Sequence, residues 1–238
     1  MAGHSKWANI KHKKALQDKK KGKLFTKFLK EVTVAAQINP DPSINSRLKT
    51  AIYKAKRMSV PKENIEKALK KGLSKEGALQ EIIYEAYGPE GVALYIECAT
   101  DNLVRTVANI RSYLTKCGGM LAKDGSLKFL FQTQSLFQIK DTFNELQELE
   151  LMDLGMEESS FEEGYTYISA PVESFGIIRD YLEKYNFVIE DAFLEKDPIQ
   201  KKTLSSEAFL KFTKLQDLLE EDEDVQEVYH NALDSNET

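Results

Sequence analysis

Apolar residues in the first third of the chain recur three and four positions apart, which predicts three short amphipathic helices. The first helix carries its apolar stripe from Phe25 to Ala36, and residues 39–43 stop it because they contain two prolines. The third opens near Pro61, which lies in its first turn, and ends at Gly72. The buried side of the second helix is predicted to consist of Ile44, Leu48, Ala51, Ile52 and Ala55.

From residue 82 onward the pattern changes to strands that alternate with helices. Residues 82–87 and 91–100 are rich in Ile, Val and Tyr, and they are predicted to pair as a hairpin through a turn at residues 88–91. Asp101 is expected to cap a helix that ends at Gly118 and Gly119. Residues 127–131 are expected to form the next strand.

A second series of strands and helices follows. Strands are expected at residues 136–139, 165–169 and 187–194, and helices at residues 141–152 and 172–185, with one further strand between residues 153 and 160 left open. This order suggests a ferredoxin-like α+β layer. A helix over residues 205–219 and a strand over residues 225–229 are predicted at the end. Because residues 82–131 supply only half of a βαββ layer, this tail is expected to return and complete it.

The predicted fold class is therefore α+β. An N-terminal three-helix bundle with a basic arm is followed by two α/β sandwich domains of ferredoxin-like type, the last inserted in the middle one. A chain of 238 residues with 42% hydrophobic side chains is long enough for two or three such units. The predicted domains are residues 1–76, residues 77–131 together with 203–238, and residues 132–202.

Charge is segregated along the chain. Residues 1–75 contain 20 Lys and Arg against 5 Asp and Glu, whereas residues 76–238 contain 13 basic and 33 acidic side chains. Folding does not require this separation, since a stable surface can interleave its charges. A positive field at one end of a protein attracts polyanions, so the sequence predicts a nucleic acid as the partner.

Residues 3–23 form a lysine-rich arm with too few apolar side chains to bury a helix face. Its lysines are interspersed with Trp7, Asn9 and His12, a mixture that offers phosphate neutralisation, a stacking plane and hydrogen bonds together. A solvated tail that aids solubility is the alternative, but such a tail needs neither the ring nor the amide. Trp7 is expected to pack on the helices or to stack on a base or sugar.

Further candidate residues lie on the helices. Arg47, Lys54 and Arg57 share one face of the second helix and form a candidate phosphate track. The junction between the second and third helices lacks the glycine common in helix-turn-helix motifs, which favours backbone recognition over base reading. The complete predicted set is Lys6, Trp7, Asn9, Lys11, His12, Lys13, Lys14, Lys19, Lys20, Lys21, Lys23, Lys27, Arg47, Lys54, Arg57 and Lys62.

The sequence offers little support for catalysis. No motif places a nucleophile beside a base, and the spacing of the three histidines matches no metal pair, so a non-enzymatic protein without cofactor or metal is predicted. The acidic run 220–224 is expected to be a solvated turn rather than a cation site. Cys98 and Cys117 are expected to be buried free thiols. Since no apolar run has the length of a signal peptide or membrane span, a cytoplasmic protein without membrane contact is expected.

Several short motifs occur in a fixed order along the chain. They are Met1–Ala15, Gly22–Lys27, Val60–Glu66, Tyr84–Pro89, Thr100–Asn102, Arg105–Val107, Gly118–Gly119 and Val225–Ala232. This series resembles the YebC family of probable transcriptional regulators. The resemblance implies three domains with a central cleft, the first domain helical and the third inserted in the second.

Two functions follow from that resemblance. The family name favours transcription control through DNA, whereas relatives that include a mitochondrial translational activator of cytochrome c oxidase act at the ribosome. DNA and RNA present the same phosphates, so charge does not separate them. The first hypothesis is a DNA-binding transcriptional regulator. The alternative is a ribosome-associated translation factor that binds ribosomal RNA or tRNA and assists elongation. Base specificity and the oligomeric state, monomer or weak dimer, stay open.

Overall fold

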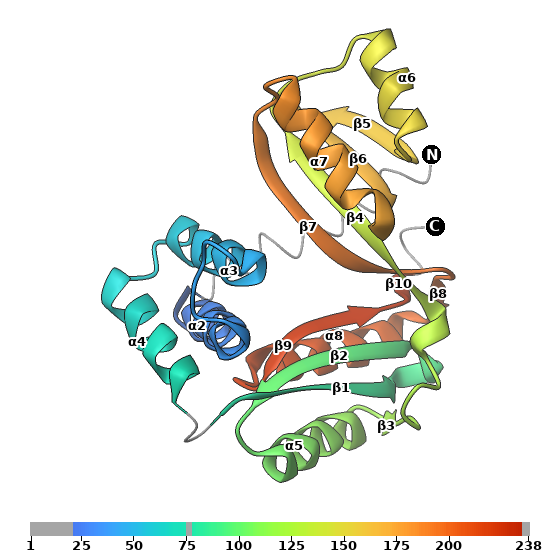
Figure 1. Cartoon of the computed structure of the whole chain (residues 1–238). Coiled ribbons are helices and arrows are strands. Elements are labelled where there is room, and N and C mark those ends of the chain that lie inside the picture. The colour runs from blue at the N-terminus through green and yellow to red at the C-terminus, as the bar shows by residue number, and fades with distance from the viewer. Residues whose placement is uncertain (1–20, 75–77, 235–238) are drawn as a thin grey trace. The chain divides into compact units, whose positions relative to one another are not determined.

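The computed structural model describes residues 21–74 and 78–234 and has an α+β fold (Figure 1). The described chain divides into two compact units. One comprises residues 131–199, and the other comprises the remaining described residues on both sides of that segment. No helix in the described part of the chain is long and apolar enough to cross a membrane.

The larger unit begins with the three predicted helices, which are confirmed. They are α2 (Lys21–Ile38), α3 (Ser46–Arg57) and α4 (Lys62–Leu73). Both α3 and α4 pack on α2, and they touch each other little. The core between them consists of Val32, Ala35, Ala36, Leu48, Ala51, Ala55, Val60, Ile65 and Ala68.

The start of α3 corrects one predicted core residue. Ile44 is 71% exposed, because the helix begins two residues later and Ile44 therefore has no place on its buried face. Asn45 caps the helix instead, since its Oδ1 accepts a hydrogen bond from the Leu48 amide at 3.0 Å. The same side chain donates to the Ala35 carbonyl at 2.8 Å, so one residue joins the end of α2 to the start of α3.

The larger unit also contains a four-stranded sheet with the order β3-β1-β2-β9. The predicted hairpin is confirmed: β1 (Gln80–Tyr87) and β2 (Ala93–Thr100) pair antiparallel around a 3₁₀ turn at Pro89–Gly91. The helices α5 (Leu103–Lys116) and α8 (Ser206–Glu221) bury their apolar sides in one core with β2 and β9 (Val225–His230). The short strands are β3 (Met120–Leu121) and a parallel pair of β8 (Lys202–Leu204) with β10 (Ala232–Asp234).

Two local predictions in this region are wrong. Asn102, not Asp101, caps α5, because the Asn102 side chain accepts a hydrogen bond from the Arg105 amide at 3.0 Å. The strand expected over residues 127–131 is a 3₁₀ turn at Lys128–Leu130, and the next strand begins only at Phe131. The buried carboxylate of Glu85 accepts hydrogen bonds from the amides of Gly125 and Leu127, which fixes this segment as a turn.

The smaller unit has the βαββαβ order of a ferredoxin-like layer, with strands in the sheet order β5-β6-β4-β7, all antiparallel. Its strands are β4 (Phe131–Ile139), β5 (Glu158–Glu162), β6 (Tyr165–Pro171) and β7 (Ile189–Pro198). Its helices are α6 (Glu145–Asp153), a 3₁₀ turn at Val172–Ser174 and α7 (Phe175–Lys184). The strand left open by the sequence is β5.

The core of the smaller unit lies between α6, α7 and one face of the sheet, as Figure 1 shows. Leu151 from α6 and Ile178 and Leu182 from α7 meet Phe137 and Ile168 from the central strands, and all five are fully buried. The other face of this sheet carries a small separate cluster of Leu136 and Tyr167, with Tyr165 and Phe193 packed against them.

Candidate nucleic-acid interface

The predicted interface residues fall into two groups. The arm residues Lys6, Trp7, Asn9, Lys11, His12, Lys13, Lys14, Lys19 and Lys20 lie outside the described residues. Lys21 and Lys23 are in the first turn of α2, where the structure describes the backbone only. The side chains of Lys27, Arg47, Lys54, Arg57 and Lys62 are described.

The predicted phosphate track on α3 has acidic partners. Arg47 holds Glu81 with two hydrogen bonds, one of them from Nη1 at 3.0 Å. Lys54 Nζ lies 3.5 Å from Glu31 Oε1. Surface pairs of this kind are worth about 0–1 kcal/mol, so a phosphate can displace the carboxylate, but each pair lowers the local positive charge. Arg57 is exposed at the end of the same helix.

The two remaining candidates differ in exposure. Lys62 has an 88% exposed side chain, and its Nζ lies 3.7 Å from Glu66 one helical turn away. Lys27 is in α2, where its Nζ donates a hydrogen bond of 3.5 Å to the Gln226 carbonyl in β9. Lys27 therefore connects two elements of its unit as well as contributing charge.

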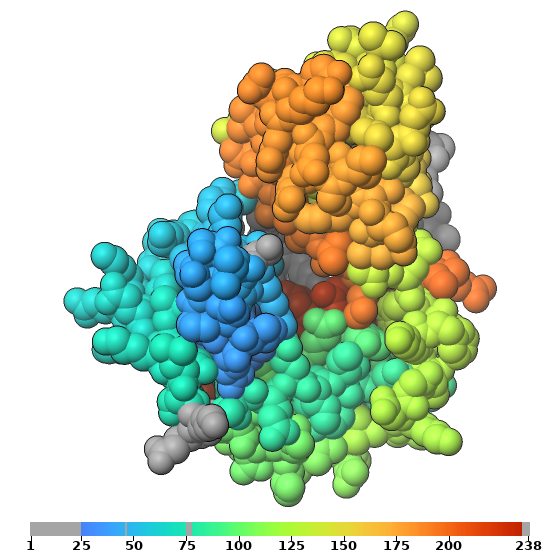
Figure 2. Space-filling model, viewed as in Figure 1, coloured from blue at the N-terminus to red at the C-terminus, as the bar shows by residue number. Residues whose placement is uncertain are grey.

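The structure adds lysines that the sequence analysis did not select. Lys49 and Lys56 on α3, and Lys67, Lys70 and Lys71 on α4, are exposed. Figure 2 shows these two helices in blue to teal. A helical wheel would have found these lysines, because none occupies the apolar stripe. They extend the basic surface of residues 1–75 over two described helices.

Beside the bundle, the same unit contains a groove of about 730 Å³ between α2, α4, α5 and the loop before β9. Four cations line it: Lys30 from α2, Lys67 and Lys71 from α4, and Arg105 from α5. Carboxylates from Asp101 and from residues 222–224 line it as well. The exposed lysines on α4 can meet an anion at the rim, while the acidic loop disfavours an anion at the floor.

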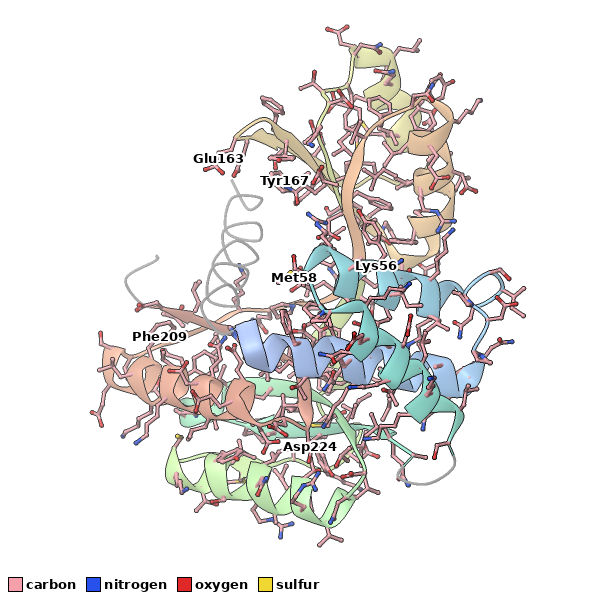
Figure 3. All side chains as sticks on the ribbon, turned by 90° about the vertical axis from the view of Figure 1, so that its left-hand side faces the viewer. Lys56, Met58, Glu163, Tyr167, Phe209 and Asp224 are labelled. Carbon is pink, nitrogen blue, oxygen red and sulfur yellow. The ribbon has the colours of Figure 1, made fainter. Side chains whose placement is uncertain are left out.

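The floor of the groove is a buried ionic network around Asp224, which is labelled in Figure 3. Asp224 Oδ1 accepts a hydrogen bond from Lys30 Nζ at 2.8 Å, and Oδ2 accepts from Arg105 Nη2 at 2.7 Å and from the Thr106 hydroxyl at 2.8 Å. Burial by itself would raise the pKa of the Asp224 carboxyl, but the hydrogen bonds from Lys30, Arg105 and Thr106 lower it to about 2.

Asp222 continues the network toward α5. Its Oδ2 accepts hydrogen bonds from Asn109 and from the Tyr113 hydroxyl, both at 3.0 Å. Burial, followed by the nearby Asp222 carboxylate, raises the pKa of Tyr113, so this hydroxyl keeps its proton and remains the donor. The Oδ1 atom of Asp222 accepts from the Asp224 amide at 2.9 Å, which shapes the loop.

This network corrects the interpretation of residues 220–224 as a solvated turn. Asp222 and Asp224 are 8% and 3% exposed, and protein donors surround both carboxylates, whereas Glu221 and Glu223 are exposed. The partners come from α2 and α5, far away in the sequence. No local pattern could have identified them.

The described residues contain no group of three or more His, Cys, Asp and Glu that could hold a metal ion. The prediction for the two cysteines is confirmed, since Cys98 and Cys117 are buried free thiols. Burial raises the pKa of the Cys98 thiol to about 12, which leaves it protonated and unreactive at neutral pH.

The fold and the basic bundle define an α+β protein whose helical N-terminal region carries the positive charge. A family profile described as "TACO1/YebC protein N-terminal domain" matches residues 5–75, and one described as "TACO1/YebC second and third domain" matches residues 79–232. The chain belongs to the TACO1/YebC family.

Similar proteins support this membership over the full length. A probable transcriptional regulatory protein of Nitrosospira multiformis is 46% identical over 240 residues, which cover 98% of this chain and 99% of the relative. One of Amoebophilus asiaticus is 43% identical over 246 residues, with all of both chains covered. The crystal structure of a conserved hypothetical protein from Aquifex aeolicus matches with a TM-score of 0.76 and 36% identity over 90% of each chain.

Proposed function

We propose that this protein is a non-enzymatic regulator of gene expression that binds nucleic acid through residues 1–75, with DNA as its first candidate target. The observation that carries this proposal is the excess of 20 basic over 5 acidic side chains in those residues. Exposed lysines on α3 and α4 extend that charge onto a folded surface. The names of the relatives, probable transcriptional regulatory proteins, agree with a role in transcription.

The binding proposed here is to the phosphate backbone. In a helix-turn-helix, the second and third helices pack together so that one of them can enter the major groove. Here α3 and α4 each pack on α2 and touch each other little. The segment that connects them along the chain, residues 58–61, contains no glycine. Lysines act as point charges and suit phosphates, whereas base reading favours groups such as Arg or Asn with paired donors and acceptors.

This arrangement also supports the second candidate, a translation factor that binds ribosomal RNA or tRNA. Backbone recognition without base reading fits a structured RNA as well as it fits duplex DNA. A lysine-rich arm that holds phosphates suits either polymer. The two candidates share the same surface and differ in the target.

The test compares the full chain with a variant in which Lys6, Lys11, Lys13 and Lys14 are changed to Gln. The matched control changes four exposed lysines elsewhere, Lys116, Lys123, Lys128 and Lys184, so that both variants have the same net charge. Only the first variant should lose affinity for a 25-base-pair duplex. Its slope of log K against log salt should also fall by about 0.9 for each phosphate that the variant no longer neutralises. Equal reductions of affinity in both variants would overturn the proposal.

The target is decided by a second measurement. A DNA regulator should prefer its own site over random duplex by about 10³ or more, whereas a ribosome factor should bind duplexes weakly without sequence preference and sediment with ribosomes. Site preference without ribosome association would remove the translation candidate, and the reverse pattern would remove DNA.

A further inference from the structure

One face of the 131–199 sheet is not covered by α6 or α7. Residues opposite each other in the register share a face. Leu136 is opposite Ser169 and Phe193, and Gln138 is opposite Tyr167 and Asp191. Helices α6 and α7 pack against Phe137 and Ile168, which lie on one face of the sheet. Successive side chains of a strand point to opposite faces, so the neighbours of these two residues in their strands lie on the other face.

Aromatic rings occupy the middle of this face. Tyr165 and Tyr167 on β6 have ring centroids 6.5 Å apart, and Phe193 packs from β7 against the same cluster. Gln138 donates a hydrogen bond of 3.4 Å to the Tyr167 hydroxyl. In Figure 3 Tyr167 lies on the side of the sheet away from α7. Tyr167 is 5% exposed, whereas Tyr165 and Phe193 are half-buried, so these two outer rings offer an apolar place on which another ring can stack.

Buried polar atoms on the same face lack partners. Within residues 21–74 and 78–234, the Ser169 hydroxyl, the Ser160 hydroxyl and Gln134 Oε1 have no hydrogen-bond partner. Ser169 is 1% exposed and Gln134 is 6% exposed. Leaving such a group unpaired costs about 1–3 kcal/mol, so a ligand that brings hydrogen-bond donors is favoured here.

The charge of this unit selects the class of ligand. Residues 131–199 contain 16 Asp and Glu against 4 Lys and Arg. Glu158 and Glu162 on β5, and Asp191 and Glu195 on β7, flank the aromatic rings on both sides. Phosphates would be repelled by these carboxylates, whereas a lysine-rich segment with a ring would be attracted.

We propose that this face binds the basic arm of the same chain, residues 1–20. The arm contains six lysines and one aspartate, together with Trp7, the single tryptophan of the protein. Its lysines complement the flanking carboxylates, Trp7 stacks on the tyrosine rings, and its amides and ammonium groups supply donors to the unpaired oxygens. The arm and this face belong to the same chain, so the interaction is intramolecular and does not depend on the concentration of the protein.

The proposed contact makes the acidic domain a competitor of nucleic acid for the arm. A phosphate polymer must displace the arm from the carboxylates before it can use the arm's lysines. This consequence rests on the proposed function, whereas the binding of the arm to the sheet does not.

The test uses the fluorescence of Trp7 in the full chain. At low salt its emission should lie at shorter wavelength than that of free tryptophan, and acrylamide should quench it weakly. Changing Asp191→Lys and Glu195→Lys should expose it and raise the quenching constant at least about twofold, because the attraction becomes repulsion. The control, Asp180→Lys with Glu183→Lys, makes the same charge change on α7, where the side chains are 72% and 65% exposed.

The milder pair Asp191→Asn with Glu195→Gln keeps side-chain size and should raise the quenching constant in the same direction if the reversed charges impair folding. Equal quenching in the β7 and α7 variants would overturn the proposal. A 25-base-pair duplex then separates the two ideas. Tighter duplex binding by the Asp191→Lys, Glu195→Lys variant supports competition between the duplex and this face for the arm. Weaker duplex binding would show that this face itself binds nucleic acid and would overturn the proposal. If Trp7 is protected but no variant binds the duplex, the proposed DNA binding is contradicted and the binding of the arm to the sheet is not.

Discussion

Lys30 and Asp224 are separated by 194 residues in the sequence, and Lys30 Nζ lies 2.8 Å from Asp224 Oδ1. The pair joins α2 of the helical bundle to the loop before β9. Their side chains are 17% and 4% exposed, and Arg105 binds the other carboxylate oxygen. Removing one partner from a buried ion pair leaves an unpaired charge.

We therefore expect Asp224→Asn to lower the free energy of unfolding by about 3 kcal/mol, because Lys30 and Arg105 lose their common anion. Chemical denaturation checks this value. The control is Glu223→Gln, which neutralises an exposed neighbouring carboxylate and should change stability by less than about 0.5 kcal/mol. Equal effects of the two changes would show that the network contributes little.

The same carboxylate should make stability depend on pH. Its pKa in the folded protein is about 2, below its ordinary value of 3.8, so the folded state binds the proton less well than the unfolded state. The resulting stabilisation, about 2 kcal/mol, is complete well above pH 3.8 and is lost as the pH falls toward 2.

Denaturation of the parent chain and of Asp224→Asn should be compared from pH 6 to pH 2. The difference in unfolding free energy between them should shrink toward low pH. A difference independent of pH would contradict the assignment of the low pKa to Asp224.

At Gly72, α4 lies very near α2. A Cβ at this position would lie 2.6 Å from the Thr33 carbonyl oxygen and 2.7 Å from the Ala36 Cβ. Gly72→Ala should therefore destabilise the bundle by about 1–3 kcal/mol, despite the higher helix propensity of alanine. Gly176 in α7 is the control, since nothing lies within 4 Å of its Cβ position, and Gly176→Ala should be neutral or stabilising. Thermal unfolding followed by circular dichroism measures both.

The lysines on α4 should matter more for nucleic-acid binding than the paired cations on α3. Changing Lys67 and Lys71 to Gln removes exposed charges, and the salt slope should fall by about 0.9 for each one that binds a phosphate. Changing Arg47 and Lys54 to Gln should have a smaller effect, because Glu81 and Glu31 already offset them. Duplex binding over a range of salt concentrations measures both variants, and a larger effect of the second pair would contradict this ranking.

The sequence by itself determined the local elements and the charge separation. Proline positions indicated the end of α2 and the start of α4, the apolar spacing indicated three helices, and the 88–91 turn indicated the hairpin. These features depend on neighbours within about ten residues, so they can be recognised in the chain. The basic character of residues 1–75 follows from composition alone.

Only the tertiary structure decided which partners the individual polar residues have. Asp222 and Asp224 belong to an acidic run that looks solvated, yet Lys30, Arg105 and Tyr113 reach them from other helices. Asp101 and Asn102 are adjacent and both can cap a helix, and the backbone entry into α5 selected Asn102. Arg47 and Lys54 look like a phosphate track, but folding places Glu81 and Glu31 beside them. A hydrogen bond or ion pair depends on distances of about 3 Å between groups, and residues far apart in the chain reach those distances only when the helices and sheets pack.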